Sequence, residues 1–116
     1  MYLRLIILLS LLPVCADADV PPDQAPEVDH LIEYLATSDC EMIRNGKAYS
    51  GEKGAQHVRR KYDHFRDQIS TTEDFIEFSA TRSALSGKDY QVTCFDQEPV
   101  RAQDWLLQEL KVYRGL

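Results

Sequence analysis

Two stretches of the sequence combine cationic, amide or hydroxyl side chains with a glycine that permits a tight turn. The first stretch is Arg44-Asn45-Gly46, and the second runs from Arg82 to Lys88. Such side chains donate hydrogen bonds to anionic or sugar-like molecules. If the two stretches converge in the fold, they form one candidate surface for a ligand or a partner. The residues of this surface are Arg44, Asn45, His57, Lys61, Ser83, Ser86 and Lys88, with Tyr49 and Tyr90 beside them.

A purely structural explanation of these residues stays open. Asn45-Gly46 and Ser86-Gly87 are pairs that turns require for their backbone geometry, and tyrosines often pack a sheet. His57 and Lys61 stand one helical turn apart, which is equally typical of a solvated helix face. The sequence therefore leaves two interpretations of the surface, a ligand site and a set of turns.

Two short motifs resemble catalytic or phosphate-binding sequences, and neither is complete. Ser50-Gly51-Glu52-Lys53 matches a serine–lysine pair of acyl-transferring enzymes, but the companion motifs are missing and a helix-capping serine explains it. Ser86-Gly87-Lys88 matches the end of a phosphate-binding loop, yet Arg82 stands where the first glycine belongs. The sequence thus predicts a protein that is not an enzyme.

The three histidines are not spaced as metal ligands on one helix. None of His30, His57 and His64 forms a pair four residues apart, the spacing that places two ligands on the same face. We therefore predict neither a bound metal nor a cofactor.

The N-terminus has the pattern of a signal peptide. A basic residue, Arg4, precedes an apolar run over residues 5–14, and small residues follow at Ala16 and Ala18. This ten-residue run, apolar apart from Ser10, is too short to cross a bilayer of about 30 Å. Residues 1–18 are predicted to be cleaved after Ala18, which leaves an exported mature protein without a stable membrane anchor. A lipoprotein signal at Cys15 is the alternative, although Val14 before it is not a small residue.

Removal of this segment leaves two cysteines, Cys40 and Cys94. Two cysteines in an exported chain indicate a disulfide, and their wide separation argues against a metal or redox motif.

The net charge of −6 excludes a typical nucleic-acid-binding protein, because phosphate backbones require an excess of Lys and Arg. The expected partner is therefore a periplasmic protein or a small ligand.

Hydrophobic spacing and turn signals predict one small α+β domain. The proline-containing residues 19–26 are predicted to form a flexible tail, and residues 27–116 to form the domain. About four helices pack on an antiparallel sheet of about three strands, in the order α-β-β-α-α-β-α. The first expected elements are a helix over 27–37, strands over 40–44 and 47–49, and a helix that Ser50 caps and whose apolar stripe runs over 55–69. They are followed by a helix over 73–81 that Thr71 or Thr72 caps, a strand over 90–94 and a helix over 100–113.

The order of motifs resembles the YfeK-like proteins, which are small exported bacterial proteins that form a domain of unknown function. The first half of the resemblance is carried by Ile43-Arg44-Asn45-Gly46, Tyr49 and His57-Val58-Arg59 with Lys61. The second half is carried by Phe75-Ile76, Ala80, Ser83, Leu85, Ser86-Gly87-Lys88 and Tyr90. Arg82 and Ala84 interrupt a run that is often serine-rich in the family. The resemblance implies a Gram-negative periplasmic setting and carries no established activity.

These observations predict a non-enzymatic interaction or accessory module of the periplasm. The alternative is a protein that binds a small anionic or sugar-like ligand through the Arg82–Lys88 loop. A polar cleft would favour the ligand, and an exposed apolar patch would favour a protein partner.

Overall fold

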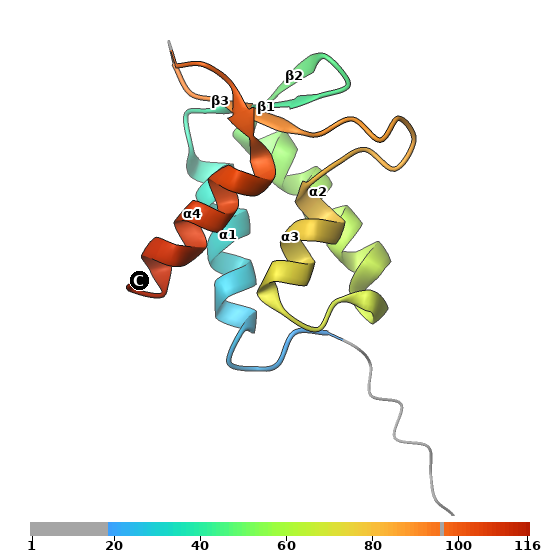
Figure 1. Ribbon diagram of the computed structural model, residues 1–116, viewed down its shortest axis with the longest axis vertical. Coiled ribbons are helices and arrows are strands. Elements are labelled where there is room, and N and C mark those ends of the chain that lie inside the picture. Colours follow the sequence, from blue (N-terminus) through green and yellow to red (C-terminus); the bar gives the residue numbers. More distant parts are fainter. Residues whose placement is uncertain (1–18, 96) are drawn as a thin grey trace, which may run out of the picture.

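The computed structural model describes residues 19–95 and 97–116, so the predicted signal peptide lies outside the described residues. A small sheet lies across one end of a group of helices (Figure 1). In chain order the elements are α1 (Ala25–Thr37), β1 (Glu41–Arg44), β2 (Lys47–Ser50), α2 (Gly51–Phe65), the 3-10 turn η1 (Arg66–Gln68), α3 (Thr72–Ala80), β3 (Gln91–Thr93), β4 (Val100–Arg101) and α4 (Ala102–Tyr113). The predicted α+β class is confirmed.

The sheet of the described residues has four antiparallel strands in the order β2-β1-β3-β4, where about three were predicted. The additional strand is β4, whose Val100 pairs with Val92 of β3. The sequence pattern assigned Val100 to the last helix instead. That helix begins at Ala102, whose N–H donates to the carbonyl of Tyr90 at 2.9 Å. Long-range pairing with β3 therefore decides where the helix begins, and a two-residue strand is too short to show an alternating pattern.

The predicted disulfide between Cys40 and Cys94 is present, with the two Cα atoms 4.2 Å apart. Each cysteine directly adjoins the β1–β3 pairing, in which Glu41 lies opposite Thr93. The bridge joins positions 54 residues apart in the sequence. On the chain-entropy argument, closing a loop of that length stabilises the fold by about 4 kcal/mol.

The helices pack with their apolar faces together beneath the sheet. The largest fully buried side chains include Leu31 of α1, Val58 of α2 and Phe75 of α3. Helix α2 approaches β1 closely at Gly54, where an added Cβ would lie 2.9 Å from the Cβ of Met42. This contact holds the first half of α2 against the sheet and so positions the side chains that follow it.

The second predicted helix ends earlier than its apolar stripe suggests. Helix α2 stops at Phe65, and the 3-10 turn then carries the chain to Ile69, which is fully buried in an extended conformation. Ser50 and Thr71 cap α2 and α3, as predicted, by accepting hydrogen bonds from backbone N–H groups. The apolar spacing identified the core residues correctly but not the end of the helix.

Residues 19–24, predicted to belong to a flexible tail, pack against the domain. Helix α1 begins at Ala25 rather than Glu27, and the side chain of Val20 is only 9% exposed. The Gln24 side-chain oxygen accepts hydrogen bonds from the N–H and the hydroxyl of Thr72. These contacts are between positions distant in the sequence, so the local proline content could not indicate them.

None of the helices in the described ranges is long and apolar enough to cross a membrane.

Candidate functional site

The two turn-containing stretches converge, which meets the condition for one candidate surface. The β1–β2 hairpin and the 82–89 loop extend on the same side of the molecule (Figure 1). The Asn45 amide nitrogen donates to Ser83 Oγ at 3.4 Å, and Ser86 Oγ donates to the Asn45 side-chain oxygen at 2.5 Å. Asn45 has a φ of 51° and Gly46 a φ of 78°, the left-handed geometry that an Asn-Gly turn supplies.

Ser83 organises the loop. Its backbone N–H donates to the carbonyl of Lys88 at 3.0 Å, and its own carbonyl accepts from the N–H of Gly87 at 2.9 Å. Its hydroxyl oxygen also accepts from the N–H groups of Leu85 and Ser86, both at 3.3 Å. Ser83 is only 5% exposed, and Gly87 adopts a φ of 71°. The buried serine and the glycine turn together define the shape of the loop. Gly87 thus supplies the backbone geometry for which the Ser86-Gly87 pair was interpreted as a turn.

A pocket of about 330 Å³ lies between the hairpin, α2 and this loop. Its lining consists of Arg44, Asn45, His57, Arg60, Lys61, His64, Phe65, Ser83, Ala84, Leu85 and Tyr90. Of the predicted surface, Ser86 and Lys88 are exposed and stand outside this lining, as does Tyr49. The loop therefore contributes mainly its shape, and the cationic groups come from the hairpin and α2.

Sequence reasoning missed Arg60, His64 and Phe65 of α2. They follow His57 by three, seven and eight residues, and Lys61 follows it by four. Positions with these offsets share one face of a helix. The helical spacing was thus a signal that could have identified them once His57 and Lys61 were singled out.

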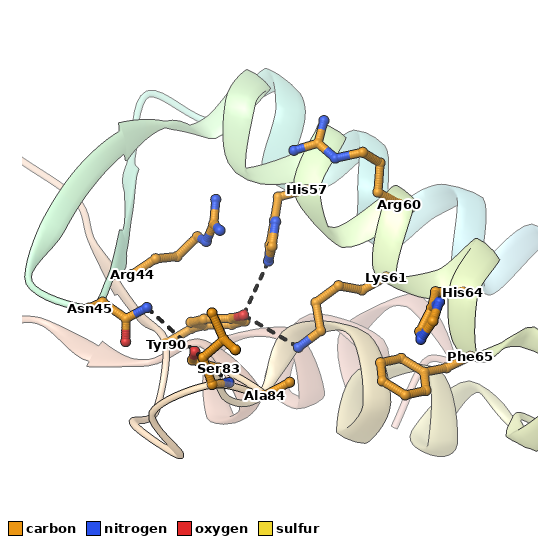
Figure 2. Close-up of a pocket in the computed structure, with 11 residues that line it drawn as sticks. Arg44, Asn45, His57, Arg60, Lys61, His64, Phe65, Ser83, Ala84 and Tyr90 are labelled. Atoms are coloured by element: carbon orange, nitrogen blue, oxygen red, sulfur yellow. Dashed lines mark hydrogen bonds between the residues drawn. The ribbon is translucent and has the colours of Figure 1, made fainter.

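The hydroxyl of Tyr90 lies at the centre of the pocket's polar end. It is 3.1 Å from His57 Nε2 and accepts a hydrogen bond from Lys61 Nζ at 3.3 Å. Lys61 also donates to the backbone carbonyl of Arg82 at 2.7 Å. The Arg44 guanidinium stacks over the rings of Tyr49 and Tyr90, 4.9 and 5.9 Å from their centres. Figure 2 shows His57 and Lys61 pointing from α2 toward this hydroxyl, with Arg44 on the other side of His57.

Burial and neighbouring cations destabilise additional positive charge here. Burial, followed by the charges of Arg44, Lys61 and Arg60, lowers the pKa of His57 to about 4. Burial and the charge of Arg44 also lower the pKa of Lys61. A neutral His57 whose Nε2 carries no proton can accept a hydrogen bond from the Tyr90 hydroxyl, whose oxygen accepts from Lys61. This arrangement satisfies all three groups without a carboxylate.

Two other arrangements considered from the sequence receive a structural explanation. The Ser50 hydroxyl of the serine–lysine motif accepts a hydrogen bond from the backbone N–H of Lys53, so it acts as a helix cap. Within residues 19–95 and 97–116, no three His, Cys, Asp or Glu side chains are grouped so as to hold a metal ion. What the pocket offers instead is a set of hydrogen-bond donors with positive charge, which is the chemistry of anion binding.

The fold and the pocket together define a small disulfide-bonded α+β domain with a basic pocket beside its sheet. Residues 22–114 match a family described as a family of unknown function (DUF5329), and the chain belongs to this family. It is 32% identical over 85 residues to the uncharacterized protein YfeK of Salmonella typhimurium, covering 72% of this chain and 71% of YfeK. No solved structure matches the chain. The resemblance inferred from the motifs is thereby confirmed.

Proposed function

We propose that this protein is exported to the periplasm and binds a small anion in the basic pocket, as a binding or accessory protein without catalytic activity. Support for export comes from the signal-peptide pattern of residues 1–18 and from the Cys40–Cys94 disulfide, which suits an oxidising compartment. Mass spectrometry of the mature protein should then find Asp19 at the N-terminus.

The observation that carries anion binding is the distribution of ion pairs. Among the described residues, five arginines each pair with a carboxylate, and these are Arg59, Arg66, Arg82, Arg101 and Arg114. Arg44 and Arg60 are without such a pair in the part of the chain that the structure describes, and both line the pocket together with Lys61.

The polar end of the pocket also lacks acidic side chains among its described lining residues. The buried Nε of Arg44 has no hydrogen-bond partner within the described residues. Burial and then neighbouring cations lower the pKa values of His57 and Lys61, and an anion would offset the part that the cations cause. The pocket therefore suits an anion better than a neutral molecule.

A titration with sulfate and with inorganic phosphate, followed by calorimetry or by amide NMR shifts, tests this function. Lys61→Met should weaken binding by about tenfold or more, since it removes a charge-assisted hydrogen bond. Lys53→Met is the matched control, because Lys53 lies exposed on the same helix outside the pocket. Equal affinities in the two variants, or no binding at millimolar anion, would contradict the proposal.

A second candidate function is docking of a periplasmic protein partner. It is favoured by Phe95, an aromatic ring that is 80% exposed directly after the disulfide. The same titration distinguishes anion binding from protein docking. If the protein binds neither sulfate nor phosphate, only the docking function remains as a candidate.

A further inference from the structure

The basic pocket adjoins a second hollow, and the two share part of their walls. The second hollow has a volume of about 320 Å³ and lies between α2, α3 and the start of the 82–89 loop. Lys61, Phe65 and Ala84 line both hollows. The far wall of the second hollow is Phe78 of α3, whose ring centre is 5.7 Å from that of Phe65. The two hollows, together called the trough, thus meet at Lys61, Phe65 and Ala84.

The two ends of this trough differ in chemistry. At one end Arg44, His57 and Tyr90 present polar or charged groups. At the other end Phe65 presents its ring beside His64, and Ala84 lies between the two ends (Figure 2). Phe78 extends the apolar surface beyond Phe65, while the Arg82–Glu77 ion pair of 2.7 Å borders it. A ligand that fills the trough therefore needs one anionic end and one apolar end.

Neutral sugars suit this lining poorly, because their hydroxyl groups require acceptors as well as donors. The guanidinium and ammonium groups of Arg44 and Lys61 only donate hydrogen bonds. The amide of Asn45 is already bonded to Ser83 and Ser86. The polar end can therefore satisfy a carboxylate or a phosphate more completely than a sugar.

The loop provides additional apolar surface at the mouth of the pocket. Leu85 lines the pocket while 98% of the residue remains exposed to water. A large apolar side chain in that position gains from contact with an apolar ligand, because both surfaces leave water. A bound ligand that packs against Leu85 would therefore explain why no part of the protein covers this side chain.

We propose, building on the anion-binding function, that the ligand is a monomeric amphiphilic anion. Its carboxylate or phosphate head binds to Arg44 and Lys61, and its alkyl or aryl group lies along Phe65, Ala84 and Phe78. Charge complementarity determines where the head group binds, and the apolar side chains of Phe65, Ala84 and Phe78 determine the direction of the tail.

The test measures dissociation constants for inorganic phosphate and for alkyl phosphates from ethyl to octyl, each below the concentration at which it forms micelles. Each methylene that enters the trough should strengthen binding by about three- to fourfold. Vesicles containing anionic phospholipid form a separate arm of the experiment, because the same head group also occurs at a membrane surface.

Ala84→Asn places a polar group in the apolar wall without changing the charge, so it should flatten the dependence of the dissociation constant on chain length. Ala48→Asn is the matched control, since Ala48 is exposed on β2 outside both hollows. In the unmodified protein, a flat chain-length series with normal phosphate binding would overturn only the amphiphile. Loss of all anion binding would overturn the anion-binding function as well, and binding to vesicles alone would overturn the monomeric ligand.

Discussion

Mild acid should destabilise the protein through His57. This side chain is half-buried and faces positive charge from Arg44 of β1 and from Arg60 and Lys61 of α2, with the Tyr90 hydroxyl against its Nε2. Its pKa is about 4 in the folded protein, whereas an unfolded histidine has a pKa of about 6.5. Between these two values, the unfolded chain binds a proton that the folded protein excludes.

The sign and size of the effect follow from proton linkage. Because the unfolded state binds more protons in this window, the free energy of unfolding falls as the pH falls from about 6.5 and levels off below about 4. Each pH unit well inside the window changes it by about 1.4 kcal/mol. From pH 7 to pH 5 the contribution of His57 therefore decreases by about 2 kcal/mol.

Urea unfolding at pH 7, 6 and 5 measures this loss in the unmodified protein and in His57→Gln. The unmodified protein should lose about 2 kcal/mol more than the variant between pH 7 and pH 5, since glutamine takes up no proton. His64→Gln is the matched control, because His64 lines the same pocket from the same helix but is exposed. It should retain the acid sensitivity of the unmodified protein.

Equal losses in the unmodified protein and in His57→Gln would refute the reasoning. That outcome would mean that the folded protein admits a proton at His57 at little cost. The positive surroundings assigned to the pocket would then be too weak to select an anion.

Two further predictions concern the fold. Arg114→Met should lower the free energy of unfolding by about 3 kcal/mol, because it leaves the buried Glu27 carboxylate without its bonds of 2.6 and 2.9 Å. Arg101→Met, which breaks an exposed pair with Asp104, should cost less than about 1 kcal/mol in the same urea experiment, and equal losses would contradict the distinction. Gly87→Val should lower the stability by about 1–2 kcal/mol, since a β-branched residue resists the φ of 71°. An unchanged melting temperature would show that the loop adapts.

Local interactions explain which parts of the fold were predictable. The Asn45-Gly46 turn and the positive φ at Gly87 follow from backbone sterics at single residues. The α2 cap follows from the hydroxyl of Ser50, which bonds a backbone N–H three residues away. The sequence by itself also determined the disulfide, because the two cysteines that follow the predicted cleavage site allow only one pairing.

Tertiary structure decided the remaining features, because they depend on residues that are distant along the chain. Strand β4 exists only because β3 offers Val100 a partner at Val92. The helical spacing places Arg60 and Lys61 on one face with His57, but it does not show that the hairpin and the loop would enclose that face. Arg114 finds Glu27 across 87 residues, whereas Arg44 finds no carboxylate within the described part of the chain. Which cations remain available for a ligand is therefore a property of the packed molecule, because ion pairing depends on distance in space and not on spacing in the sequence.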